Sequence, residues 1–248
     1  MKSEQYYLDK YKPILYLHYK ESISPISWED YLKNSISIEN DRINFIGKSI
    51  VPDKKNINDI PFYGKVNFND NDYFIDLVYI FLYPINKGYK IAFWNDIGYH
   101  TGDIEHIIIR INKYTEKIIK VFFSAHSKEH TIHYLKDLSL CNHCNTLKVY
   151  VALNSHANYV KPKTYFRIFG FANDKTSNKG IYWHPTQVIN IDTMNKTNYK
   201  SIGLTKSNKF SVRGLFRRNF KFIETKKCFL FYEILNIIKR KNKFILNF

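Results

Sequence analysis

The chain has 248 residues, and its 44% hydrophobic and 17% aromatic content excludes an intrinsically disordered protein. Lys and Arg number 38 against 22 Asp and Glu, so the protein is basic, with a formal net charge of +16 at pH 7. Asn, Lys and Ile are abundant throughout, which we interpret as the mark of an AT-rich genome. This bias inflates the charge and weakens any inference of nucleic-acid binding from charge alone.

Three cysteines are too few for a disulfide scaffold. Cys141 and Cys144 form a single CxxC, which is half of a zinc site, and we expect free thiols at a hairpin tip. Residues 1–7 lack the apolar region of a signal peptide, and no segment reaches the roughly 18 apolar residues of a membrane span. The sequence therefore predicts an intracellular protein, cytoplasmic or peripheral to a membrane, without a transmembrane helix.

The N-terminal part predicts a short apolar strand at residues 12–19, followed by a short helix through Leu32. Ser27 is the expected N-cap of this helix, and Asp30 takes the place of the usual Glu in a capping box. Residues 36–72 are polar, with Asp, Asn, Gly and Pro scattered among them, and predict loops with one short strand at most. This segment is either a lid over a site or an insertion.

Phe74–Leu82 is the most apolar stretch of the N-terminal half and predicts a buried strand. It carries one acid, Asp76, which is either a buried ligand or a polar residue on an exposed face. The following Pro84, Asn86 and Gly88 predict a turn.

Gly98–Ile111 is the central stretch, in which a polar cluster runs directly into a β-branched segment. The segment predicts a strand that is buried on both faces. Side chains alternate along a strand, so Asp103 and Glu105 point to one side and His106 to the other. His100 lies in a glycine-flanked turn that can fold back over the two carboxylates.

Two later predicted strands also end in polar residues. Residues 117–126 return from a turn as a hairpin and end at His126, and residues 147–153 lead to His156. Three strand ends that carry carboxylates or imidazoles predict one divalent-cation site, with Mg, Ca or Mn favoured and Zn allowed. The alternative is three unrelated, hydrogen-bonded histidines. The predicted ligands are His100, Asp103, Glu105, His126 and His156, and Asp96, in the loop after a short strand at 89–94, is a candidate extra oxygen ligand.

Five segments resemble, in order, the motifs of the vacuolar protein sorting-associated protein 62 family. The central stretch is similar to its GNHVGDWEH-type signature, and the segment before it to a Tyr-Pro-Tyr-Asn-x-Gly motif. The resemblance spans about residues 11–192 and implies a β-sandwich that Trp183 and Asp192 help to close. The matching segments are Lys12–His18 with Pro25, Phe81–Gly88, Gly98–Arg110, Ser124–His126 and Val149–Ala157.

A more distant likeness, to the necrosis- and ethylene-inducing toxin family, rests on the last three motifs. In those toxins the matching acidic and His positions hold a divalent cation beside a membrane-glycolipid site, so the resemblance implies the same at the five predicted ligands. Two positions depart from both families. Ile104 stands where Trp is usual, which changes packing, and Ser127–Glu129 stands where Gly-Gly is usual, so the loop after His126 cannot turn in the same way.

The fold class is thus mainly β: a single β-sandwich over residues 11–192 with a few short helices, then a basic extension at 193–248. Residues 209–248 hold 11 Lys and Arg against two Glu. Their apolar run Cys228–Ile238 is too short to span a bilayer, and predicts either contact with an anionic membrane surface or docking on the domain. The weak candidates for lipid contact are Arg217, Arg218, Lys239 and Arg240.

The favoured function is a non-catalytic protein that binds a divalent cation and a membrane lipid or glycan headgroup. The second is a metal-dependent hydrolase at the same site, with His106, Ser124 or Ser155 as proton shuttle or orienting group. No Gly-x-Ser-x-Gly, HExxH or P-loop pattern is present, so no known motif supports the hydrolase. Nucleic-acid binding is the least favoured, because the charge lacks a recognised module.

Overall fold

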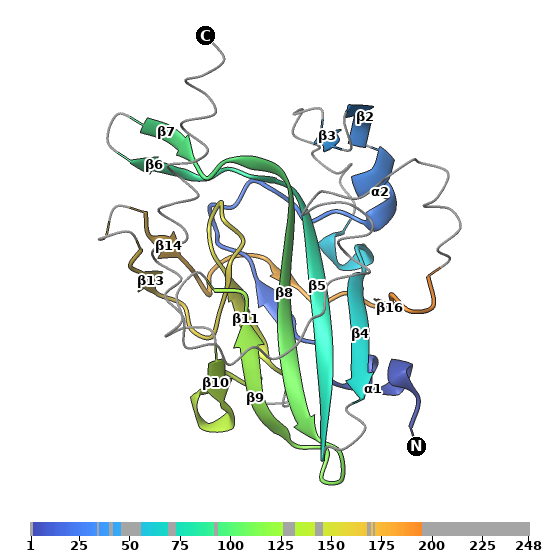
Figure 1. Cartoon of the computed structure of the whole chain (residues 1–248). Coiled ribbons are helices and arrows are strands. Elements are labelled where there is room, and N and C mark those ends of the chain that lie inside the picture. The colour runs from blue at the N-terminus through green and yellow to red at the C-terminus, as the bar shows by residue number, and fades with distance from the viewer. Residues whose placement is uncertain are drawn as a thin grey trace.

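Two β-sheets packed face to face form the body of the protein in a computed structural model of the chain (Figure 1). The predicted β-sandwich is therefore confirmed. The structure describes residues 2–33, 35–39, 42–45, 56–68, 73–91, 94–125, 132–141, 146–167, 170 and 172–194.

The larger sheet has six strands in the order β10-β9-β8-β5-β4-β16. Its central pair, β5 and β8, is antiparallel and pairs along its full length, from Phe74 opposite Asn112 to Asn86 opposite His100. The last strand, β16, runs parallel to β4. The strands are β4 (Phe62–Phe68), β5 (Phe74–Asn86), β8 (His100–Asn112), β9 (Ile118–Phe123), β10 (Ile132–Tyr134) and β16 (Val188–Asn190).

The smaller sheet has four strands in the order β12-β11-β1-β15, so the N-terminal strand lies between two strands from the second half of the chain. β1 is parallel to β11 and antiparallel to β15. Three further two-stranded pairs lie in the part of the chain that the structure describes. The strands are β1 (Ile14–Tyr16), β11 (Lys148–Val151), β12 (Asn158–Tyr159) and β15 (Tyr182–Trp183); the pairs are β2 (Ser35–Glu39) with β3 (Arg42–Phe45), β6 (Tyr89–Ile91) with β7 (Trp94–Ile97), and β13 (Thr164–Tyr165) with β14 (Asp174–Lys175).

Strand alternation divides the core into two clusters. Odd-numbered residues of β5 and β8 point between the sheets, where they meet Leu15, Val149 and Trp183. Even-numbered residues of the same strands pack on the opposite face against Ile26 and Trp28. The central strands are thus buried on both faces, as the β-branched run predicts.

The helices are short. α2 (Trp28–Lys33) begins at the predicted cap, where the Asp30 N–H donates to Ser27 Oγ over 3.1 Å. α1 (Glu4–Lys10) was not predicted from the sequence; Ser3 caps it by accepting from Tyr6 N. The described residues also form two 3-10 helices, η1 (Ile57–Asp59) and η3 (Leu135–Asp137).

Three sequence predictions need correction. The turn predicted at Pro84 is wrong, because Pro84 lies within strand β5. Strand β4 pairs only with residues 75–80 of β5, so β5 has no β4 partner at Pro84. The missing N–H of proline is therefore tolerated there. His100 is the first residue of β8 and not part of a turn. Asp192 does not close the core, because its carboxylate is on the surface and pairs with Lys65 Nζ at 3.0 Å. Trp183 does close it and is fully buried.

Two further points concern the segment 36–72 and membranes. The segment contains the seven-residue strand β4 as well as β2 and β3, so the prediction of at most one short strand is wrong. Among the described residues, no helix has the length and apolar content needed to cross a membrane.

Candidate functional site

Asp103 and Glu105 lie on the inner face of β8, between the two sheets. They are 4% and 9% exposed and share this face with Ile107 and Ile109 of the main core. The strand period places them here, two residues apart, as predicted. Burial of two carboxylates is costly unless polar groups or a cation meet them.

His156 reaches Asp103 from the turn that follows β11. Its Nδ1 lies 3.0 Å from Asp103 Oδ2, and the imidazole stacks on the ring of Tyr83 with 3.9 Å between centroids and 3° between planes. The turn is tight: Asn154 and His156 have φ values of 67° and 54°, in the left-handed region that side chains other than glycine rarely occupy. Such backbone is held only where its surroundings restrain it.

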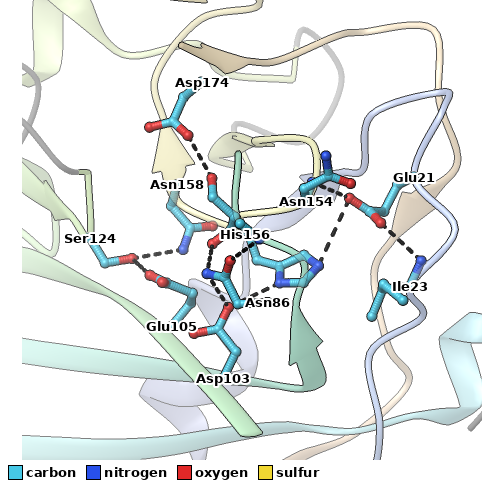
Figure 2. A network of polar contacts seen from close by, with 12 residues as sticks. Glu21, Ile23, Asn86, Asp103, Glu105, Ser124, Asn154, His156, Asn158 and Asp174 are labelled. Atoms are coloured by element: carbon cyan, nitrogen blue, oxygen red, sulfur yellow. Dashed lines mark hydrogen bonds and ion pairs between the residues drawn. The ribbon is translucent and has the colours of Figure 1, made fainter. Parts of the chain in front are cut away.

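Amide and hydroxyl groups connect the two carboxylates to this turn (Figure 2). Asn86 Nδ2 donates to Ser155 O at 3.2 Å and lies 3.5 Å from Asp103 Oδ2. Ser124 Oγ is hydrogen-bonded to Glu105 Oε2 and accepts from Asn158 Nδ2 at 2.9 Å. The polar network thus joins β5, β8, β12 and the turns after β9 and β11.

Three buried polar atoms around this network have no hydrogen-bond partner among the described residues. They are the Tyr83 hydroxyl, His156 Nε2 and Asn158 Oδ1. Burial raises the pKa of the Tyr83 phenol well above its usual value of 10.0, and nearby carboxylates raise it further, namely Glu105, Asp103 and Glu21. Buried polar groups normally have partners, so their concentration here marks a place for a polar ligand.

Of the five predicted ligands, the structure brings Asp103 and His156 into contact, and Glu105 lies two residues from Asp103 on the same face of β8. The side chain of His100 and the whole of His126 lie outside the described residues. Asp96 is in strand β7 and not in the predicted loop, and its side chain is also outside them. Within the described part of the chain, no group of three or more His, Cys, Asp or Glu is arranged to hold a metal ion. The cation therefore stays a prediction.

The hydrolase candidates do not converge on one point. His106 points to the opposite face of β8 from the carboxylates and stacks on Phe122, with 5.5 Å between centroids. Ser124 is bonded to Glu105. Ser155 is fully buried and donates to Asp174 Oδ1 at 2.6 Å. Among the described residues these three side chains therefore have separate partners, and the hydrolase stays a prediction.

Sequence reasoning missed two acids that support the site. Glu21 lies 3.8 Å from His156 Nε2, on the side of the ring away from Asp103. Asp174 is fully buried and accepts from Ser155 and from the Tyr89 and Tyr159 hydroxyls. Burial, and then the charge of Asp174, raises the pKa of Tyr159. Both acids lie far from the central stretch in sequence, and no local pattern marks them.

A cavity of about 710 Å³ opens beside Glu21. Its walls are the segment after β1 and the segment before β15, which approach so closely that a Cβ on Gly180 would lie 1.9 Å from Leu17 O. Only glycine fits at that position. Burial lowers the pKa of His18 below its usual value. The lining residues are Leu17, His18, Tyr19, Glu21, Ile23, Ser24, Asn56, Ile57, Lys179, Gly180, Ile181 and Tyr182.

One segment of the chain matches a known protein family, and this segment contains Asp103 and Glu105. Residues 86–182 match the family model of vacuolar protein sorting-associated protein 62. This segment is less than half of the chain, and it includes Asp103, Glu105 and His156. The resemblance to that family is therefore confirmed over these residues. No curated protein sequence matches the chain.

A solved structure described as a toxin fold is similar to this chain in its fold. This structure, "Toxin fold for microbial attack and plant defense", is 13% identical, covers 87% of this chain and 90% of its own, and has a TM-score of 0.50. Another, "NLPPya in complex with mannosamine", is 12% identical, covers 89% of this chain and 90% of its own, and has a TM-score of 0.49. The likeness to the toxin family is thus confirmed at the level of the fold alone.

Several predicted features of the C-terminal half lie outside the described residues. They include Cys144 and everything beyond residue 194. The boundary between a domain at 11–192 and an extension at 193–248 therefore stays a prediction, as do the lipid-contact candidates Arg217, Arg218, Lys239 and Arg240.

Proposed function

We propose that this protein is a non-catalytic β-sandwich that binds a divalent cation at Asp103 and Glu105, and a membrane lipid or glycan headgroup beside it. The observation that carries the proposal is the concentration of buried polar atoms without hydrogen-bond partners, among the described residues, around two buried carboxylates. A cation that entered this place would offset the buried negative charge.

The chemistry of the donors favours a hard cation. Carboxylate oxygens, the Asn158 amide oxygen and the Tyr83 hydroxyl oxygen are the kind of ligands that Mg, Ca and Mn prefer. The cation would supply a fixed positive charge for phosphate or hydroxyl oxygens of a headgroup. His156, bonded through Nδ1 to Asp103, fits the role of a residue that orients a ligating carboxylate.

The cavity beside Glu21 supports the headgroup part of the proposal. Its volume of about 710 Å³ is in the range of small-molecule sites, and its walls mix aromatic and aliphatic side chains with hydrogen-bonding groups. Tyr19 and Tyr182 are 56% and 59% exposed there, and such rings present an apolar face and a polar tip. Glu21 lines this cavity and also faces His156, so the two places are neighbours.

Calorimetric titration with CaCl2, MgCl2 and MnCl2 tests the cation. We expect about one equivalent to bind to the full chain, and Asp103→Asn to weaken the affinity by about 100-fold or more, because it removes a ligating charge. Asp192→Asn is the matched control, since this surface acid should leave the affinity unchanged. Equal affinity in both variants, or no binding to the wild type, would refute the proposal.

Vesicle flotation tests the headgroup. The full chain should float with vesicles that contain phosphatidylinositol or phosphatidylserine in the presence of the cation, and less so with a chelator. A variant shortened to residues 1–208 separates the basic C-terminal residues from the described domain. If the chain floats equally well with and without the chelator, the cation is not needed for membrane binding.

A further inference from the structure

We propose that Glu21 is a positioning residue of the cation site: it holds His156 from the side opposite Asp103 and thereby fixes the Asp103 carboxylate. The inference rests on the proposed function, because it concerns the affinity of the same site. Glu21 lies outside residues 86–182, so neither the family match nor the central stretch of the sequence points to it.

Carboxylates lie at both edges of the His156 ring. Asp103 Oδ2 is 3.0 Å from Nδ1, and Glu21 Oε2 is 3.8 Å from Nε2. Tyr83 covers one face of the imidazole in a nearly parallel stack. The ring is fully buried. Figure 2 shows it between Asp103 on one side and Glu21 on the other.

Glu21 is itself fixed in place. Its Oε1 accepts the N–H groups of Ser22 and Ile23, both at 2.9 Å, and its Oε2 accepts the N–H of Asn154 at 2.7 Å. The side chain is 2% exposed. A carboxylate that accepts three backbone N–H groups has little freedom to move.

The bond to Asn154 is the important one, because Asn154 begins the left-handed turn that carries His156. Glu21 therefore restrains both the backbone of that turn and the ring at its end. Glu21 thus acts on the Asp103 carboxylate through His156. Residues outside the direct ligands of a metal typically change its affinity by about 10–100-fold when they are mutated.

The decisive experiment is a titration of Glu21→Gln with CaCl2 and MnCl2. Gln keeps the length and one acceptor oxygen but loses the charge beside Nε2, so we expect the Kd to rise about 10–100-fold. Glu29→Gln, an exposed change on α2, is the control and should leave the Kd unchanged. A Kd in Glu21→Gln equal to that of the wild type would overturn the inference while leaving the cation site standing.

A nuclear magnetic resonance measurement separates positioning from general stability, and its first part uses the wild type alone. In the wild type, CaCl2 should shift the amide signals of Ser22, Ile23 and Asn154 together with the imidazole signals of His156. Glu21→Gln should move the same imidazole signals without cation. If the three amides stay unmoved while the cation binds, Glu21 is not coupled to the site. If the wild type binds no cation, the proposed function is wrong. Imidazole signals that stay unmoved in Glu21→Gln would in addition show that Glu21 does not contact His156.

Discussion

Asp76 and Arg110 form a two-bond ion pair across the central strands β5 and β8. Arg110 Nε and Nη2 donate to the two Asp76 oxygens at 2.7 and 2.8 Å. The pair occupies the face opposite to Asp103, because both residues have even numbers. This contact decides the question that the sequence left open: Asp76 is a buried residue of an ion pair and lies away from the candidate cation site.

At the residue scale, Asp76→Ala should therefore cost about 3–5 kcal/mol of the free energy of unfolding, because it removes a two-bond carboxylate partner from a largely buried guanidinium. Urea denaturation measures this. Asp192→Ala removes a surface pair, with Lys65, and should cost no more than about 1 kcal/mol. Similar losses in the two variants would mean that burial does not set the strength of these pairs.

At the scale of elements, α1 is joined to the turn between β8 and β9 by Glu116. Lys2 Nζ and Lys10 Nζ lie 2.6 and 2.5 Å from its carboxylate, and the Tyr11 hydroxyl donates to its carbonyl. These contacts, with the hydrogen bond from Lys10 the largest, lower the pKa of Glu116 from 4.5 to about 2. The turn itself occurs where the sequence predicts it, because Asn112 Oδ1 accepts two following N–H groups.

The lowered pKa of Glu116 determines how the stability of the folded state changes with pH. The folded state holds Glu116 ionised more strongly than the unfolded state, so its contribution to stability is present above pH 4.5 and is lost as the pH falls toward 2. The Tm difference between wild type and Glu116→Gln should therefore be largest near pH 7 and shrink below pH 4.5. A Tm difference between the two proteins that stays the same below pH 4.5 would contradict this account.

At the scale of the whole molecule, the segment that matches the family model does not contain either sheet in full. Residues 86–182 lack β1, which separates β11 from β15 in the smaller sheet, and they lack β4 and nearly all of β5 from the larger one. Without them the inner face of β8 loses Leu15 of β1 and the inward side chains of β5, which pack beside it in the core.

A fragment of residues 86–182 should consequently show no cooperative thermal unfolding by circular dichroism, whereas the full chain should unfold in a single transition. The fragment also lacks Glu21, so it should not bind CaCl2 with the affinity of the full chain. A folded fragment with wild-type affinity would show that β1 and β5 are dispensable for the site.

The sequence by itself determined the local features. The β-branched run specifies a strand buried on both faces, and its period of two places Asp103 and Glu105 on one side and His106 on the other. Ser27 with Asp30 specifies the start of α2. These predictions hold because they depend only on neighbouring residues.

Only the tertiary structure decided which distant groups meet. Nothing near Glu21 in the sequence indicates His156, which lies 135 residues later, and nothing near Ser155 indicates Asp174 as its partner. A single sequence carries the period of each strand, but the order and register of the strands arise from burial against other strands. The inner face of β8 could thus be predicted, while the residues that surround it came from the packing of the two sheets.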